Sequence, residues 1–226
     1  MVARTGKPLQ ELAETLQKEF GISAKTIAKD LSGPKAPEEI YSELGSQPID
    51  VLVNNAGFGL SGLFKETDLA TELGMLQLNI AALTHLTKLF LKDMIKRGSG
   101  KILNVASTAA FQPGPSMAVY YASKAYVLSF SEALACEVRG TGVSVTVLCP
   151  GLTESNFLAR AGIRHSRLAR LQMMDVDTVA QAGYEGLIQN KTVVIPGFIN
   201  RVFVWLVSIT PRSWATKIIL WLHQKN

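Results

Sequence analysis

Apolar residues recur along the chain in two alternating patterns. The first is helical spacing: Leu9, Leu12 and Leu16 lie three or four residues apart and predict a helix that ends at Gly21. The second is a short continuous run, as at residues 49–53, which is typical of a strand buried on both faces. These patterns predict helices at residues 9–20, 37–44, 67–94, 116–138 and 175–188, and strands at residues 22–28, 49–53, 101–106, 144–148 and 192–195.

This alternation of strands and helices predicts an α/β fold, in which a parallel sheet carries crossover helices on both faces. A chain of 226 residues, 47% of them hydrophobic, is long enough for one such domain and short for two. We therefore assign residues 1–200 to one domain and residues 201–226 to a C-terminal amphipathic helical extension.

Composition narrows the classes of function. The formal net charge of +5 is modest, and an anionic cofactor explains it as well as a nucleic acid does, so we expect no nucleic-acid partner. Cys136 and Cys149 stand in hydrophobic periodic segments outside any Cys/His cluster, which indicates reduced core residues and no metal site. Residues 1–16 do not fit a signal peptide, so we expect a cytoplasmic protein.

The C-terminal segment is strongly apolar but short. Residues 202–209 cover about a third of the length that a bilayer crossing requires. With Pro211, Arg212, Trp214 and the apolar run at residues 218–222, they show the pattern of two amphipathic helices. Three placements are open for these helices: on a membrane surface, on another subunit, or docked on the chain's own domain.

Unusual residues follow three of the predicted strands. In an open parallel sheet, ligands bind outside the carboxyl ends of the strands, so these positions are the first place to look for chemistry. The segments are Asn-Asn-Ala-Gly at residues 54–57, Ala-Ser-Thr at residues 106–108 and Cys-Pro-Gly at residues 149–151. Asn and Gly are also common turn formers, and local turn chemistry is the competing interpretation for each segment.

The predicted helix at residues 116–138 carries Tyr120 and Lys124 four residues apart, which places both side chains on one helical face. An ammonium beside a phenol favours the phenolate and lowers the pKa of the tyrosine toward values useful for proton transfer. Tyrosine and lysine also occur at this spacing by chance on solvated helices.

Taken together, these features resemble the short-chain dehydrogenase/reductase family over residues 3–200. Ser107 stands thirteen residues before Tyr120, and the Tyr-x-x-x-Lys pair, the Asn-Asn-Ala-Gly turn and the Pro-Gly turn occur in the family's order and spacing. The resemblance implies a Rossmann-like doubly wound parallel sheet. It also implies a reaction in which hydride passes between a nicotinamide cofactor and a carbonyl compound or secondary alcohol.

The same resemblance implies the catalytic roles. Tyr120 is expected to be the general acid or base, and Lys124 is expected to lower its pKa and hold the nicotinamide ribose. Ser107 is expected to orient the substrate oxygen, while Asn79 matches an asparagine that holds a water molecule in a proton relay. This logic is physically sound, because donors must already point to the oxygen on which negative charge develops. We interpret Tyr121, the nearest rival to Tyr120, as a packing residue.

The choice between NAD and NADP is inferred from Ala3 and Arg4, which align with the end of the family's second strand. An uncharged residue followed by arginine suits the 2′-phosphate of NADP, whereas an acidic residue favours NAD, so we expect NADP. An exposed N-terminal arginine and a helix cap at Asp30 are the competing interpretations. The resemblance assigns adenine to Asp30 and Leu31, the adenosine ribose to Asn54, Ala56 and Gly57, and the nicotinamide and pyrophosphate to Pro150, Gly151, Thr153 and Ser155.

The sequence departs from the family at its start. No Gly-x-x-x-Gly-x-Gly phosphate loop occurs before Asn54, and the family's first strand and first helix have no counterpart. In the family's sheet order the first strand lies beside the strand that ends at Val53, so we expect a sheet open in its middle with an unpaired edge. Two explanations are open: a start codon assigned too late, which we favour, and a true truncation that has lost tight cofactor binding.

Residues 157–174 stand where the family places its substrate lid. The segment is apolar and basic, with charges at Arg160, Arg164, His165, Arg167 and Arg170. It suits an acidic or acyl-carrier-linked substrate with an apolar body, although an amphipathic lid with one solvated face explains the pattern without any ligand. Our leading hypothesis is an NADP-dependent oxidoreductase that acts on an apolar, steroid-like or fatty-acyl ketone, aldehyde or secondary alcohol. The alternative is a non-catalytic scaffold or inactive fragment, and at the family level we expect a homo-oligomer.

Overall fold

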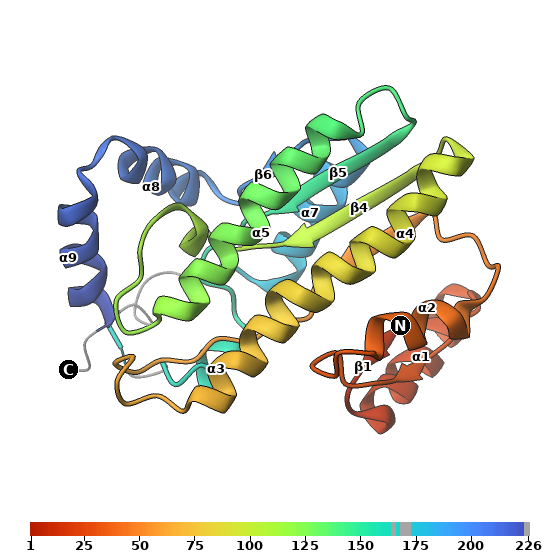
Figure 1. Cartoon of the computed structure of the whole chain (residues 1–226), viewed down its shortest axis with the longest axis horizontal. Helices are drawn as coiled ribbons and strands as arrows, with labels where there is room; N and C mark the ends of the chain where they lie inside the picture. Colours follow the sequence, from red (N-terminus) through yellow and green to blue (C-terminus); the bar gives the residue numbers. More distant parts are fainter. Residues whose placement is uncertain (164–165, 168–172, 224–226) are drawn as a thin grey trace.

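The computed structural model describes residues 1–163, 166–167 and 173–223 and has a parallel sheet with helices on both faces (Figure 1). The main sheet has the strand order β3 (Val51–Asn54), β4 (Gly100–Val105), β5 (Val143–Leu148) and β6 (Val193–Val194). Each neighbouring pair is parallel, so the strands end at the same edge. The predicted Rossmann-like α/β class is confirmed.

Helices cover both faces of this sheet. Helices α4 (Leu83–Arg97) and α5 (Ala118–Glu137) lie on one face, and α7 (Val176–Ile188) lies on the other. Strand β4 shows why: Ile102 packs in a cluster with residues of α4, whereas the next residue, Leu103, packs with residues of α7. Successive side chains of a strand point to opposite faces, so a continuously apolar strand fills both cores.

One of the two cysteines departs from expectation. Cys149 is buried after β5, but Cys136 is exposed near the end of α5. The prediction of a core position for Cys136 is therefore wrong, because Cys136 lies on the exposed side of α5 with Glu132 and Glu137, while Leu134 packs against the core.

The N-terminal residues form a separate two-stranded sheet. Strand β1 (Val2–Ala3) pairs in parallel with β2 (Ile27–Ala28), and helix α1 (Gly6–Phe20) packs on this pair. Helix α2 (Ala36–Leu44) packs against α4. The strand predicted over residues 22–28 is reduced to two residues, because β1 offers a ladder of only two positions.

The edge of β3 that faces away from β4 has no strand partner in the described part of the chain. The apolar side chains of Val51 and Val53 are 43% and 51% exposed there. The expected opening in the sheet is thus confirmed, and it separates the β1–β2 pair from the main sheet.

The long helix predicted over residues 67–94 is present, with an irregular middle. It runs through α3 (Leu69–Leu76), a π-helical segment η1 (Gln77–Ala82) and α4, and it ends at Gly98 with a φ of 70°. Asn79 lies within η1. Wide π turns inside α-helices occur frequently at functional sites, because they turn a side chain away from the regular helical register.

The C-terminal helices α8 (Phe198–Ile209) and α9 (Arg212–His223) lie together at one end of the molecule (Figure 1). The boundary assigned at residue 200 falls within α8. Ile219 of α9 belongs to the same buried cluster as Tyr120 of α5 and Leu158 of the short helix α6 (Phe157–Arg160). The inner faces of the two helices are therefore part of the core that surrounds Tyr120.

A chain of buried polar side chains joins the strands to the helices beneath the carboxyl edge. The Asn54 amide donates to Asn104 Oδ1 at 2.8 Å and Thr87 Oγ1 at 3.0 Å, and the Asn104 amide donates to Ser131 Oγ at 2.9 Å. These bonds link β3, β4, α4 and α5. Because the groups are buried, each missing partner costs free energy that water cannot restore.

We expect Asn104→Ala to lower the free energy of unfolding by about 2–3 kcal/mol, because it removes two buried hydrogen bonds at once. Urea denaturation checks this through the transition midpoint. Gln189→Ala, which truncates an exposed amide, serves as the control and should change stability by less than about 0.5 kcal/mol. Equal stability of the two variants would contradict the importance of the polar chain.

Candidate active site

The register of the sheet brings three loops to one edge. Asn54 is aligned with Asn104, and Val105 with Leu148, so the segments that follow β3, β4 and β5 begin side by side. The second and third segments are joined directly, since the Thr108 amide donates to the Pro150 carbonyl at 2.8 Å. This edge is where the sequence predicted the chemistry to lie.

Ser107 and Tyr120 meet at this edge. Ser107 is extended and precedes the 3-10 turn η2 (Thr108–Phe111), and its Oγ accepts from the Ala109 amide at 3.1 Å. Tyr120 stands in the first turn of α5, is buried, and forms a hydrogen bond with the Ser107 hydroxyl. The structure thus places a hydroxyl and a phenol together, as the sequence predicted.

Lys124 lies one turn further along α5. Its Nζ is 5.9 Å from the centre of the Tyr120 ring and donates to the Val105 carbonyl at 2.8 Å. Burial lowers the pKa of Lys124 to about 8, because the charged form loses its hydration. The ammonium is therefore held beside the phenol by the end of β4.

The pKa of Tyr120 differs from the sequence-based expectation. Burial raises it to about 12, and the hydrogen bond with Ser107 offsets part of this rise. Lys124 contributes no lowering of this pKa, and the desolvation of the phenolate outweighs the effect of Ser107. Tyr120 is consequently a neutral phenol at neutral pH and has a proton to give.

Asn79 connects the η1 segment to the loop after β3. Its Oδ1 accepts from the Phe58 amide at 3.2 Å, and its Nδ2 donates to the Phe58 carbonyl at 3.0 Å and to Ser123 Oγ at 3.1 Å. The side chain therefore clamps the loop backbone. Its implied role in holding a water molecule stays a prediction.

Gly57 allows this loop to pass close to the site. A Cβ atom at this position would lie 3.0 Å from Asn79 Oδ1 and 3.5 Å from Lys124 Nζ. A side chain at this position would crowd the Asn79 amide and the Lys124 ammonium, so glycine lets the loop backbone pass close to both. Ala56 is exposed in the same loop, whereas the Asn54 side chain points inward and leaves its backbone at the edge.

The residues assigned to adenine and the 2′-phosphate lie on the N-terminal sheet. Arg4 is exposed directly after β1. Asp30 follows β2, and its carboxylate accepts from the Ser32 amide at 2.9 Å, so it stabilises a turn there instead of a helix cap. Leu31 packs against the core beside α4.

The segment after β5 passes close to Asn200 of α8. A Cβ at Gly151 would overlap the side-chain amide of Asn200, which donates to the Pro196 carbonyl at 2.8 Å. Thr153 Oγ1 donates to the Gly151 carbonyl at 3.1 Å, and Ser155 Oγ accepts from the Phe157 amide. Asn200 was missed from the sequence because its partner is 49 residues away and no motif marks it.

Apolar and aromatic side chains form a wall beside Tyr120. The Phe157 ring is 5.3 Å from the Tyr120 ring, and a Cβ at Gly59 would be 2.9 Å from Phe157. Leu158, Ala161 and Ile163 are buried in the same cluster, whereas Arg160 is exposed. Among the basic residues expected in the lid, Arg164, His165 and Arg170 lie outside the described residues.

Tyr121 packs behind Tyr120, as predicted, and has a polar partner that the sequence did not reveal. Its hydroxyl forms a 2.9 Å hydrogen bond with His223 Nε2 at the end of α9. Burial raises the pKa of Tyr121 and lowers that of His223, so both are neutral at neutral pH. This contact joins α9 to the helix that carries the candidate catalytic pair.

These residues fit the nicotinamide end of a dinucleotide. The bond to Val105 uses one of the three N–H donors of Lys124, and the backbone of Gly57 lies beside the ammonium without a side chain to cover it. The phosphate end is different, because residues 1–54 hold no glycine-rich phosphate loop. The fit therefore extends to the ribose and the reacting ring, and we assign no pyrophosphate contact to residues 1–54.

Fold and site together define a Rossmann-like protein with a Ser-Tyr-Lys centre. The family model described as short chain dehydrogenase matches residues 1–164, and the chain belongs to this family.

Among related proteins, the chain is 35% identical over 153 residues to the 17-beta-hydroxysteroid dehydrogenase type 3 of Mus musculus. The aligned residues cover 66% of this chain and 50% of that protein. It is 36% identical over 167 residues to sulfoacetaldehyde reductase 2 of Chromohalobacter salexigens, which is 72% of this chain and 66% of that protein. The chain thus spans about half to two-thirds of these relatives. A solved short-chain dehydrogenase from Sphingobium yanoikuyae in complex with NADPH is 28% identical and has a TM-score of 0.81, with 94% of this chain and 86% of that chain covered.

We expect Lys124→Met to raise the free energy of unfolding at pH 7 by about 2 kcal/mol, because it removes a buried charge at the loss of one hydrogen bond. The folded pKa of Lys124, about 8, lies below the unfolded value of 10.5, so between these values the unfolded wild-type chain binds more protons and wild-type stability rises with pH. The extra stability of Lys124→Met over the wild type should therefore be largest below about pH 8 and should disappear as the pH approaches 10.5. Denaturation midpoints over this pH range check it.

Lys88→Met, at an exposed position of α4, is the matched control and should show no such dependence on pH. A Lys124→Met protein less stable than the wild type at pH 7 would contradict the interpretation, since it would mean that the buried ammonium is fully compensated.

Proposed function

We propose that this protein is an NADP-dependent oxidoreductase that interconverts an apolar ketone or aldehyde and the corresponding alcohol. The observation that carries the proposal is the meeting of Ser107, Tyr120 and Lys124 at the carboxyl edge of the sheet. Tyr120 is a buried, neutral phenol bonded to a hydroxyl, and an ammonium lies one helical turn away.

The geometry supports a separate role for each of these side chains in the reaction. A bound nicotinamide supplies or accepts the hydride. Ser107 and Tyr120 hold the carbonyl oxygen with two hydroxyl donors, where negative charge develops. Tyr120 then transfers its phenolic proton to that oxygen, and Lys124 stabilises the phenolate that remains. In the direction of oxidation, the same groups act in reverse order.

Two features support NADP as the preferred cofactor. Arg4 is an exposed guanidinium directly after β1, where it is available to a 2′-phosphate. The similar structure from Sphingobium yanoikuyae holds NADPH. Lys124 would hold the nicotinamide ribose, and the loops at Gly57 and Gly151 would border the cofactor.

The apolar wall formed by Phe157, Leu158 and Ile163 supports an apolar substrate. The names of the relatives point in two directions, to a hydroxysteroid and to a sulfonated aldehyde. The cluster around Tyr120 favours the first kind, because the side chains packed about the phenol are aromatic and aliphatic.

A non-catalytic scaffold is the second candidate. It is favoured by the edge of β3 that has no strand partner in the described residues. Against it stands the buried Lys124: a scaffold has no use for a costly buried ammonium, and a methionine would fill the same space.

We expect Tyr120→Phe to lower kcat for carbonyl reduction at least about 100-fold, because it removes the proton donor. The loss of NADPH absorbance with a panel of apolar ketones and aldehydes measures it. Tyr121→Phe is the matched control: it removes the bond to His223 and should retain most of kcat while lowering stability by about 1–2 kcal/mol. Absence of turnover by the wild-type chain with every substrate at saturating NADPH would favour the scaffold.

We expect Arg4→Ala to lower the ratio of kcat/KM with NADPH to kcat/KM with NADH about tenfold or more, because a charge-assisted bond to the 2′-phosphate is lost. Lys7→Ala, which removes a nearby exposed cation from α1, is the control and should leave the ratio within about twofold. An unchanged ratio in Arg4→Ala would remove Arg4 from the cofactor site.

A further inference from the structure

The outer faces of α8 and α9 are apolar and exposed. Trp205, Trp214 and Trp221, which are all the tryptophans of the chain, are 61%, 66% and 55% exposed. In α8 the exposed apolar residues recur on one side of the helix, at Phe198, Ile199, Val202, Trp205, Leu206 and Ile209. We call the exposed faces of α8 and α9 the C-terminal face.

Both helices have a second, buried side that fixes their orientation. Val204 of α8 is buried, and in α9 the buried residues Ala215, Ile219 and His223 lie opposite the exposed stripe. The exposed stripe of α9 contains Trp214, Ile218 and Trp221, with Lys217 among them. The apolar residues of the C-terminal face are therefore held outward by helices whose inner sides are already packed.

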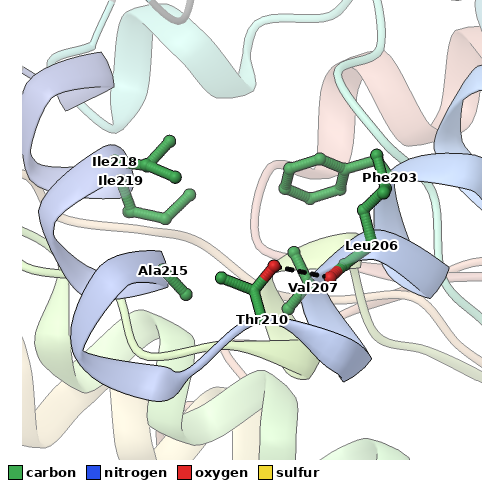
Figure 2. Close-up of a pocket in the computed structure, with 7 residues that line it drawn as sticks. All are labelled: Phe203, Leu206, Val207, Thr210, Ala215, Ile218 and Ile219. Atoms are coloured by element: carbon green, nitrogen blue, oxygen red, sulfur yellow. Dashed lines mark hydrogen bonds between the residues drawn. The ribbon is translucent and has the colours of Figure 1, made fainter.

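A groove runs between the two helices. Figure 2 shows its apolar lining, in which side chains from α8 and α9 face one another across a space of about 290 Å³. The Thr210 hydroxyl in this lining donates to the Leu206 carbonyl at 2.7 Å, so it is already satisfied within the helix end. The groove thus suits hydrocarbon, because it presents no unmet polar group among the residues drawn. Its lining residues are Phe203, Leu206, Val207, Thr210, Ala215, Ile218 and Ile219.

The net positive charge of the chain is concentrated in the segment that contains α8 and α9. Residues 186–226 contain five lysines and arginines and no aspartate or glutamate, while the other 18 basic residues balance the 18 acidic residues of the chain. The formal net charge of +5 therefore lies wholly in this segment. Arg201, Arg212 and Lys217 are exposed on α8 and α9, beside the apolar stripes.

We propose that the C-terminal face docks on the surface of an anionic phospholipid membrane. Tryptophans at the boundary between water and hydrocarbon, apolar stripes and flanking lysines and arginines are the features of a helix that lies in such a surface. No helix in the described residues is long and apolar enough to cross a bilayer. A second copy of the chain is the poorer occupant, because it would place two basic faces against each other.

The proposal is tested by sedimentation of the whole chain with vesicles. Vesicles of phosphatidylcholine with phosphatidylserine should carry the protein into the pellet, and vesicles of phosphatidylcholine alone should retain much less. Tryptophan fluorescence should shift to the blue on binding, since all three tryptophans would enter the interface. Added salt should weaken the binding.

Two double variants separate the apolar and the electrostatic contributions. Trp205→Gln with Trp214→Gln should weaken binding at least about tenfold. Arg201→Gln with Lys217→Gln should weaken binding to the anionic vesicles about tenfold or more. Phe20→Gln with Lys18→Gln, which changes an exposed aromatic residue and a cation at the end of α1, is the matched control and should bind as the wild type does.

Circular dichroism melts establish that each variant is folded, as expected for exposed positions, and none of these measurements depends on catalytic activity. Equal pelleting with both kinds of vesicle, or equal losses in the control and the tryptophan variant, would overturn the proposal. It would also be overturned by a dimer in solution that the tryptophan variant dissociates, because the C-terminal face would then be an interface between copies.

Discussion

The alignment of the carboxyl ends of β3, β4 and β5 is the constraint on which the site depends. The parallel register places Asn54 beside Asn104 and Val105 beside Leu148, so three loops begin at one edge. Helix α5 is fixed against this edge by the bond between Lys124 and the Val105 carbonyl and by the polar chain that ends at Ser131. Backbone pairing in the sheet thus determines the distance between Ser107 and Tyr120.

The packing that brings Tyr120 and Lys124 together also removes both side chains from water, which disfavours their charged forms. Burial pushes the pKa of Lys124 down to about 8 and that of Tyr120 up to about 12, so each group disfavours its charged form. A phenol with a raised pKa holds its proton until a stronger acceptor forms, and a substrate alkoxide is such an acceptor. In the proposed reaction, the free energy that burial of Lys124 costs is recovered when Tyr120 gives up its proton, because the ammonium then faces a phenolate.

Local sequence patterns predicted the candidate site residues, whereas contacts between residues far apart in the sequence could be found only in the structure. The proximity of Tyr120 and Lys124 could be predicted because four residues along a helix fix a common face, while the resemblance to the family singled the pair out. The clamp of Asn79 on Phe58 could not, because it depends on a π turn that the hydrophobic pattern does not distinguish from a regular helix.

Contacts made by the C-terminal residues could likewise not be predicted from the sequence. Tyr121 and His223 are 102 residues apart, and their bond exists only because α9 folds back onto α5. The short β2 was overestimated for a related reason: its length is set by the two residues of β1 and not by its own apolar run.

The C-terminal helices show how one element contributes to two surfaces. Ile219 faces the cluster around Tyr120, while Trp214 and Trp221 of the same helix face outward. A face that rests on a membrane would therefore share a helix with the apolar wall of the site. An apolar substrate partitions into the bilayer, so a site built against α9 would lie close to the phase in which such a substrate is most concentrated.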